Sequence, residues 1–309
     1  MEQVLAHLKA LAELTRLRIV ALCARSDLSV SDLTQILDQS QPRVSRHLKL
    51  LVEGGLLERH REGSFAFFRL NRGAEAPAVL PALLGALPET DPQLKADRSR
   101  LETVLAARAA RAAAYFAENA DQWDELRRHY VHEEVVEAEL INLIKAKPVQ
   151  TLLDIGTGTG RILQVLGPLV ESALGVDQSS EMLAVARAAL DRDGLNHATV
   201  RQGSFYALPG DGAFDMAVAH QVLHYAETPD LVIAEAARVL APGGRLVVVD
   251  FKEHDLDALR EDHAHRWLGF GVEEVETWCR AAGLIPNKPK TLAGDPLTVL
   301  IWVAEKPAS

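Results

Sequence analysis

A glycine-rich turn directly after a strand-like segment constrains this chain more than any other feature. Residues 151–155 have the sequence Thr-Leu-Leu-Asp-Ile, and residues 156–160 follow as Gly-Thr-Gly-Thr-Gly. Glycine adopts backbone conformations that other residues avoid, and it lets a ligand come close to the main chain. A glycine turn at the carboxyl end of a strand is typical of ligand-binding doubly wound α/β domains. Such a domain is therefore expected here.

The sequence after residue 150 supports this fold class, because short β-rich runs alternate with helical stretches. We predict strands at 151–155, 172–177, 198–202, 214–219, 245–251 and 297–304. We predict helices at 160–169, 180–192, 231–239 and 272–282. This order indicates a doubly wound, Rossmann-like sheet whose strands are mostly parallel.

The first 73 residues have a different pattern, namely helices followed by a hairpin. Apolar residues of helical period occupy 14–23, Ser29 is a helix cap, and a further helix begins near Pro42 and stops at Gly54. Residues 93–119 and 133–145 predict two more helices before the sheet domain. We therefore expect three regions: a domain of helices and a hairpin at 1–73, a helical linker or dimerisation region at 74–147, and a sheet domain at 148–309.

The charge differs in sign between the two ends of the chain. The net charge is −10, yet residues 1–73 hold 11 Lys/Arg and 8 Asp/Glu, while the remaining residues hold 22 and 35. An acidic surface repels a phosphate backbone, so any DNA contact is expected in the N-terminal part.

The predicted helix that starts at residue 41 carries a row of hydrogen-bond donors without an acidic residue among them. Long donors on one face and apolar residues on the other suit a helix that enters the major groove of DNA. The hairpin after it is also basic and fits a wing beside the recognition helix. A solvated basic face would have the same composition, and the pattern alone leaves both interpretations open. The candidate DNA-binding residues are Gln41, Arg43, Ser45, Arg46, His47, Lys49, Arg59 and Arg61.

Residues 14–19 (LTRLRI), 40–51 (SQPRVSRHLKLL) and 61–63 (REG) resemble the winged helix-turn-helix of ArsR-type repressors. The resemblance implies a homodimer on a palindromic operator in double-stranded DNA. Many members of that family sense metals through two cysteines, and the matching positions here are Ser29 and Ser31. Serine is a poor ligand for soft metals, so no metal site is expected.

The spacing of the glycines separates two classes of ligand. Dinucleotide sites favour G-x-G-x-x-G, but the position of the last glycine is Arg161 here, and the third glycine is Gly160. Asp154 also precedes the turn, and a carboxylate would hinder a pyrophosphate. The pattern D-x-G-x-G-x-G resembles the first motif of class I S-adenosylmethionine-dependent methyltransferases. That resemblance implies a seven-stranded sheet and S-adenosylmethionine or S-adenosylhomocysteine as the bound cofactor.

The same resemblance assigns candidate cofactor residues along the chain. Asp177, at the end of the second strand, would accept both ribose hydroxyls, and Met182 would pack on the adenine. Ser204 stands where the family often has an acid, so its contact with the adenine amine is weaker, while Phe205 would offer its backbone donor. The full set is Asp154, Gly156, Thr157, Gly158, Gly160, Asp177, Gln178, Met182, Ser204, Phe205 and His220.

Catalytic residues are less well specified by the sequence. His220, His224 and His254 follow strands on the ligand side of the sheet and could act as a base or position an acceptor, or could simply bond the backbone. A structural role is preferred for His263 and His265, for Asp215, and for the aromatic residues Tyr115, Phe116 and Trp123. Cys279 is the only cysteine in the sheet domain, which argues against methylation of arsenite.

Two functions remain. In the first, the protein is a cytoplasmic DNA-binding regulator whose second domain senses the cofactor and controls methyl-cycle genes. In the second, it is an active methyltransferase, on an unidentified acceptor, that the DNA-binding domain regulates or localises. No apolar run has the roughly 20 residues that a membrane-spanning helix requires, so no membrane partner is expected.

Overall fold

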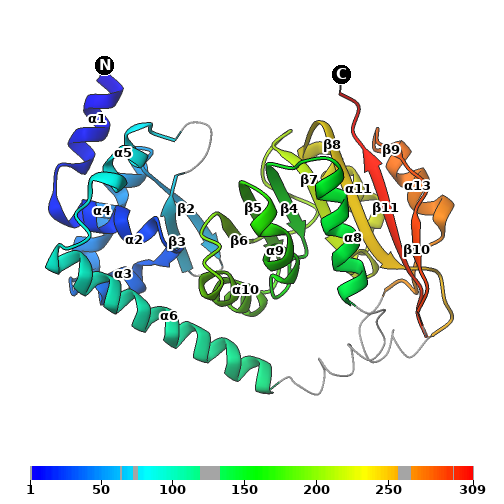
Figure 1. Cartoon of the computed structure of the whole chain (residues 1–309), viewed down its shortest axis with the longest axis horizontal. Coiled ribbons are helices and arrows are strands. Elements are labelled where there is room, and N and C mark those ends of the chain that lie inside the picture. Colours follow the sequence, from blue (N-terminus) through cyan, green and yellow to red (C-terminus); the bar gives the residue numbers. More distant parts are fainter. Residues whose placement is uncertain are drawn as a thin grey trace. The chain divides into compact units, whose positions relative to one another are not determined.

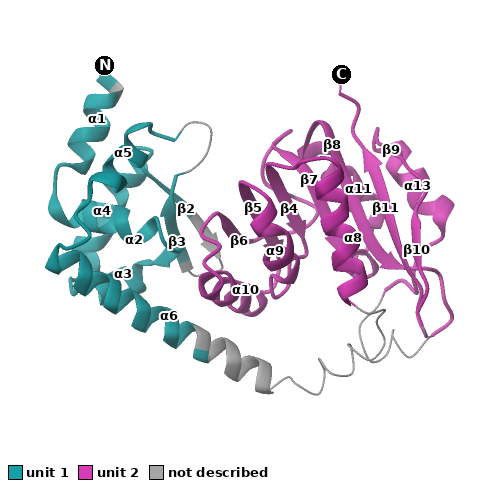
Figure 2. Ribbon diagram, viewed as in Figure 1, with its two compact units in different colours: residues 1–111 teal, residues 112–309 magenta. Residues whose placement is uncertain are grey.

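A computed structural model describes residues 2–62, 65–71, 76–118, 133–256, 266–294 and 296–308. The chain forms two compact units, residues 1–111 and 112–309 (Figure 2).

The first unit is a helical domain with a small antiparallel sheet (Figure 1). The sheet has the order β1-β3-β2. The helices and strands of this part of the chain are α1 (Glu2–Leu11), α2 (Leu14–Cys23), β1 (Leu28–Ser29), α3 (Val30–Leu37), α4 (Gln41–Glu53), β2 (Leu57–Glu62), β3 (Phe65–Leu70), α5 (Val79–Ala86) and α6 (Pro92–Glu118).

Local sequence determines where α3 and α4 begin. Ser29 accepts a hydrogen bond from the backbone of Asp32, and the Asp32 carboxylate accepts one from the Ser29 backbone, which completes a capping box. Pro42 lies in the first turn of α4, where its missing N–H costs nothing. Val44 and Leu48 on α4 are fully buried, so the opposite face of this helix is left to solvent.

Two polar contacts tie α6 to the first unit. Arg18 of α2 donates from Nε and Nη2 to both carboxylate oxygens of Asp97 on α6, at 2.6 and 2.7 Å, and both side chains are buried. Further along α6, Arg108 reaches Asp32 at 3.2 Å. Leu80 of α5 and Leu101 of α6 join the same apolar core as α2, α3 and α4. The first unit thus includes helices from the region expected as a linker.

The second unit is built on one sheet with the strand order β10-β11-β8-β7-β4-β5-β6, to which β9 adds beside β11. Strands β6, β5, β4, β7 and β8 are parallel to one another, β11 is antiparallel to β8, and β10 is antiparallel to β11. The strands are β4 (Thr151–Ile155), β5 (Ser172–Asp177), β6 (Ala198–Gln202), β7 (Phe214–His220), β8 (Leu240–Phe251), β9 (Ile285–Pro286), β10 (Lys290–Leu292) and β11 (Val299–Glu305). The helices are α8 (Glu133–Ala146), α9 (Arg161–Leu166), η1 (Gly167–Leu169), α10 (Ser180–Arg192), η2 (Leu223–Tyr225), α11 (Pro229–Val239) and α13 (Val272–Ala281).

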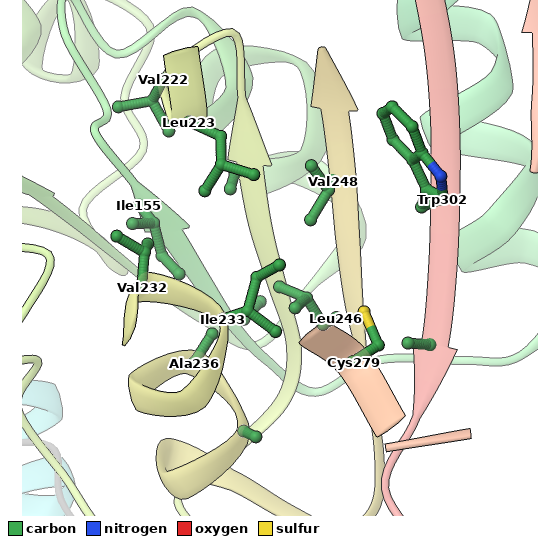
Figure 3. Close-up of a cluster of buried hydrophobic side chains, with 14 of the residues drawn as sticks. Ile155, Val222, Leu223, Val232, Ile233, Ala236, Leu246, Val248, Cys279 and Trp302 are labelled. Carbon is green, nitrogen blue, oxygen red and sulfur yellow. The ribbon is translucent and has the colours of Figure 1, made fainter. Parts of the chain in front are cut away.

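Helices cover both faces of this sheet. Apolar residues of α8, α9 and α10 pack with the strands in one core, and residues of α11 and α13 pack in a second core on the other face. Figure 3 shows part of the second core, where Ile233 and Cys279 lie against Leu246 and Val248 of β8. The sheet is buried on both faces, as the long apolar strands require.

The fold class predicted from the sequence is confirmed, including a mostly parallel sheet with seven strands on its main path. Three predicted strands coincide with β4, β5 and β6. Strand β8 begins at Leu240 rather than at 245, because its first residues pair with the start of β7. Trp123, His263 and His265 lie outside the described residues, as do the side chains of Tyr115 and Phe116. Within the described ranges, no helix is long and apolar enough to cross a membrane.

Candidate functional site

The glycine turn lies where the order of the strands reverses. Strand β4 pairs with β5 on one side and with β7 on the other, so the carboxyl ends of these three strands are neighbours. In open α/β sheets, ligands bind at this point. The backbone N–H groups of Gly156 and Thr157 donate to the Val176 carbonyl of β5 at 2.8 and 3.0 Å, which anchors the turn to the sheet.

Gly156 and Gly158 both need to be glycine, for different reasons. Both have positive φ angles, 68° and 52°. A Cβ on Gly156 would lie 2.2 Å from a methyl carbon of Val222, so this glycine lets the turn pack against the segment that follows β7. A Cβ on Gly158 would meet nothing within 4 Å. The main chain at Gly158 is therefore not covered by neighbouring atoms, so a ligand can come close to it.

Asp177 holds the open side of the turn from the end of β5. Its Oδ2 accepts a hydrogen bond from the Gly158 backbone at 2.8 Å, and its Oδ1 accepts one from the Ser179 backbone at 2.9 Å. The Ser179 hydroxyl caps α10 by accepting from the Met182 backbone. Asp177 is half-buried, Met182 is half-buried and Gln178 is exposed. A carboxylate oxygen has two lone pairs, so Asp177 keeps acceptor capacity for a hydroxyl-bearing ligand.

Asp154 supports the turn from below. Its side chain is buried, and its Oδ2 accepts a hydrogen bond from the Thr157 hydroxyl at 2.6 Å. Burial raises the pKa of the Asp154 carboxyl to about 7, against the lowering effect of the Thr157 hydrogen bond, and the Asp177 carboxylate adds to the rise. The structure thus places Asp154 beneath the turn and leaves Asp177 as the carboxylate on its open side.

The loop after β6 carries the other two candidates for contacts with a base. Ser204 and Phe205 are half-buried, and the Ser204 hydroxyl accepts from the Tyr206 backbone at 3.2 Å. Arg238 of α11 fastens this loop by donating to the carbonyls of Leu208 and Gly210 at 2.6 and 2.7 Å. Arg238 therefore attaches this loop to α11, a contact that was not predicted from the sequence.

The three candidate catalytic histidines have different surroundings. His220 ends β7 and is half-buried; burial lowers its pKa to about 4, against the raising effect of the Asp250 and Glu137 carboxylates. It is therefore neutral at pH 7. Gln221 follows with a φ of 52°, an uncommon value for a side-chain-bearing residue, and such strain gathers at functional sites. His254 is half-buried, and its Nδ1 accepts from the Leu256 backbone at 3.2 Å.

His224 forms a fully buried pair with Asp250. Their Nδ1 and Oδ1 atoms are 2.7 Å apart, and both side chains have no exposed surface. Asp250 also accepts from the backbone of Leu223 at 3.1 Å and of Phe251 at 2.8 Å. These hydrogen bonds hold η2 in place beside the glycine turn. Because the His224 ring is buried, it is not accessible to a methyl acceptor that enters from solution. Asp215 likewise has the expected structural role, since it accepts from the backbone of Gln150 and Thr151 at 2.9 Å.

All but one of the candidate DNA-binding residues of α4 are exposed to solvent. Gln41, Arg43, Ser45, Arg46 and Lys49 are exposed. His47 is half-buried, with its Nδ1 3.6 Å from a Glu13 carboxylate oxygen. On β2, Arg59 is exposed, and Arg61 lies two residues further along the strand with a side chain outside the described set.

At the position of the family's thiolates, the structure has a hydroxyl network. The Ser29 and Ser31 hydroxyls are 2.8 Å apart, and Ser29 also donates to Asp32 at 2.7 Å. Arg108 of α6 joins this network through Asp32. These hydrogen bonds and the contact between Arg108 and Asp32 connect α3 to α6.

Comparison with known proteins agrees with both halves of this description. Residues 13–59 match the model of bacterial regulatory proteins of the arsR family, and residues 153–248 match a methyltransferase domain model. The arsenic resistance transcriptional regulator ArsR1 of Pseudomonas putida is 40% identical over 95 residues, which cover 30% of this chain and 73% of that protein. The chain belongs to the ArsR family.

This ArsR-family protein carries a methyltransferase domain as its second unit. An arsenite methyltransferase of Aquipseudomonas alcaligenes is 40% identical over 124 residues, covering 36% of each chain. The chain spans 36–44% of the length of the first four curated relatives. A complex of the Haloferax volcanii Trm112 methyltransferase activator with a methyltransferase shares the fold, at a TM-score of 0.51 and 22% identity over 62% of this chain and 96% of that one.

The two units imply DNA binding and a cofactor of the S-adenosylmethionine type. The cradle at Gly158 and the carboxylate of Asp177 fit the ribose and backbone contacts that such a nucleoside needs. When bound, that cofactor supplies an activated methyl group. Arg238, Asp250 and the ion pair between Glu137 and Arg161 were not predicted from the sequence, since all three depend on contacts between distant segments.

Proposed function

We propose that this protein is a transcriptional regulator whose methyltransferase unit binds S-adenosylmethionine or S-adenosylhomocysteine as the sensed ligand, and that it controls genes of the methyl cycle. The observation that carries the proposal is the pairing of Asp177 with the uncovered Gly158, on a chain that also presents the donor row of α4. Ribose hydroxyls would bond Asp177, and the adenine would lie between Met182 and the Ser204–Phe205 loop.

The surroundings of the turn favour sensing over catalysis. A general base works best when its pKa lies near the operating pH, and the pKa of His220 is lowered to about 4. His224 is enclosed. Cys279 is buried, and burial raises its pKa to about 11, so it offers no thiolate for arsenite. Arsenite methylation is therefore not part of the proposal.

A homodimer belongs to the same proposal. Val4, Leu5 and Leu8 of α1 are 53%, 52% and 47% exposed. Large apolar side chains at this spacing share one face of a helix, and covering them by a second copy would remove them from water. A dimer would also place two α4 helices for the two halves of a palindromic operator. Sedimentation of the wild type and of a Leu5→Asp/Leu8→Asp variant tests this: we expect a dimer and a monomer, respectively.

Calorimetry and DNA binding together test the sensor. The full chain is titrated with each form of the cofactor, and its affinity for a duplex selected from a random-sequence library is measured by fluorescence anisotropy with and without ligand. We expect ligand to change the DNA affinity by about 5- to 150-fold, the usual size of allosteric coupling. Asp177→Asn should abolish this response by weakening cofactor binding at least tenfold.

Asp193→Ala is the matched control, because Asp193 is also an aspartate beside α10 but at that helix's other end. It should behave as the wild type. A ligand response that survives in Asp177→Asn would refute the sensor. Transfer of a labelled methyl group to any component of a metabolite pool would instead support the alternative, an active methyltransferase.

A further inference from the structure

His47 is the one candidate DNA-binding residue of α4 that is mostly covered by the protein. Its side chain is 13% exposed, whereas Arg43 and Arg46 on the same helix are exposed. Its Nδ1 is buried and has no hydrogen-bond partner among the residues that the structure describes. A Glu13 carboxylate oxygen lies 3.6 Å from this nitrogen, which is close enough for an ion pair but too long for a hydrogen bond. A buried nitrogen without a partner calls for an explanation.

Glu13 lies where two other helices of the first unit meet. It is the N-cap of α2, and its Oε2 accepts a hydrogen bond from the Arg16 backbone at 2.9 Å. The Arg16 guanidinium in turn donates to the carbonyls of Lys9 and Ala10 near the end of α1. Helix α4 packs against both α1 and α2. A contact between His47 and Glu13 therefore fixes the recognition helix to the junction of α1 and α2.

The charges around this pair keep Glu13 ionised and His47 neutral in the protein alone. Burial acts to raise the pKa of the Glu13 carboxyl, but backbone hydrogen bonds, that of Arg16 first, lower it below its ordinary value. Burial lowers the pKa of His47, against the raising effect of the Glu13 carboxylate. Three arginines lower it further, namely Arg16 of α2 and, on α4 itself, Arg43 and Arg46. The pKa of His47 therefore lies below its ordinary value of 6.5, and the ring is neutral at pH 7.

A phosphate backbone beside α4 reverses this balance. Arg43 and Arg46 are exposed, so phosphates neutralise their charges on binding. The phosphates also bring negative charge of their own, which favours the protonated imidazole. The pKa of His47 is therefore higher on DNA than in the free protein. An imidazolium carries an N–H on both ring nitrogens, so Nδ1 is then a donor that faces Glu13.

We propose that His47 is a positioning residue of the recognition helix, which takes up a proton when α4 binds DNA and then donates from Nδ1 to the Glu13 carboxylate. The proton comes from solvent, and no covalent bond to a heavier atom changes. The closed contact holds α4 at the junction of α1 and α2 and gives the buried nitrogen its partner. DNA binding therefore becomes stronger as the pH falls. This device concerns DNA binding alone and does not depend on the ligand that the second unit senses.

The pH dependence of DNA binding tests the proposal. The full chain, without cofactor, is titrated onto the duplex selected from a random-sequence library at constant salt between about pH 5.5 and about pH 8, with fluorescence anisotropy as the readout. The affinity due to this proton is complete below the pKa of His47 in the free protein and is lost as the pH rises through its higher pKa on DNA. We expect the wild-type affinity to fall by up to about tenfold per pH unit for each bound α4.

Substitutions on both sides of the contact show which groups are responsible. His47→Gln should remove this pH dependence, because glutamine does not titrate. Glu13→Gln keeps an oxygen that can cap α2 but loses the charge, so the change in affinity over the pH range should shrink at least about threefold. Adding Glu13→Gln to His47→Gln should alter the pH dependence no further. His7→Gln is the matched control, since His7 is also a half-buried histidine of the first unit but belongs to α1, and it should keep the wild-type pH profile.

Four results would overturn the proposal. A wild-type pH profile in His47→Gln would show that another group takes up the proton. An affinity that falls in His47→Gln by the same factor at every pH would make this residue a packing contact only. Tighter binding with an unchanged pH profile in Glu13→Gln would make His47 a direct phosphate contact. A wild type that binds no duplex would refute DNA binding by α4 itself. Thermal melting shows whether each variant is folded, and Glu13→Gln decides the question if His47→Gln is not.

Discussion

Replacing Gly158 by alanine separates ligand approach from backbone strain. Gly158 has a φ of 52°, and a Cβ there meets nothing within 4 Å. The added methyl group therefore clashes with no protein atom and instead occupies the space in which a ligand would approach the turn. Gly194, at the end of α10, has a φ of 70°, and a Cβ there would also meet nothing within 4 Å. It provides the same strain far from the turn.

The magnitudes follow from the backbone. A left-handed conformation costs a residue with a side chain about 1–2 kcal/mol, so Gly158→Ala and Gly194→Ala should destabilise the second unit equally. A domain of this size loses about 2–4 °C of melting temperature per kcal/mol, which predicts a fall of roughly 2–8 °C in each variant. Gly156→Ala should be worse, because its methyl would lie 2.2 Å from Val222 and overpacking adds about 1–3 kcal/mol.

Calorimetry with S-adenosylhomocysteine and thermal melting without ligand give the two readouts. We expect Gly158→Ala to lose at least tenfold in affinity, which is about 1.4 kcal/mol, while Gly194→Ala binds as the wild type does. If Gly158→Ala binds within twofold of the wild type, the ligand does not approach this glycine, which would contradict the proposed contact. If both variants lose affinity equally, loss of stability accounts for the effect.

Three further changes test other parts of the molecule. Arg46→Ala should weaken DNA binding by about 1–3 kcal/mol without altering cofactor affinity. The control is Arg25→Ala, because Arg25 is an exposed arginine beyond α2, and this variant should alter neither affinity. Unchanged DNA affinity in Arg46→Ala would refute the assigned recognition helix. Asp97→Asn should leave Arg18 as a buried unpaired charge and destabilise the first unit by about 3–5 kcal/mol. Asp38→Asn, at an exposed aspartate, should not change the stability. A wild-type melting temperature for Asp97→Asn would contradict this prediction. The pKa of His220 in the folded protein, about 4, lies below its ordinary value of 6.5. Between these two pH values the unfolded chain binds a proton at this residue and the folded chain does not. The stability due to neutral His220 is therefore lost as the pH falls from 6.5 to 4. Asp154 acts in the opposite sense over that range, so the difference in melting temperature between wild type and His220→Gln isolates this effect; a difference independent of pH would contradict it.

The two kinds of domain and most of the residues near the glycine turn were predictable from the order of amino acids alone. Glycine spacing and strand–helix alternation are local properties, because backbone freedom and side-chain period are set by consecutive residues. For this reason the bounds of β4, β5 and β6 were predicted correctly, and Asp177 was identified as a residue at the end of a strand. The donor row of α4 was likewise predictable from helical spacing.

The contacts of those residues, in contrast, depend on how the folded chain brings distant segments together. Asp154 and Asp177 are both carboxylates beside the turn, yet burial against Thr157 places one beneath it and leaves the other on its open side. The pairing of His224 with Asp250, separated by 26 residues, required η2 to pack against β8. The pairing of Glu137 with Arg161 required α8 to pack against α9. Electrostatics and desolvation depend on distances through space, and no local pattern in the chain encodes those distances.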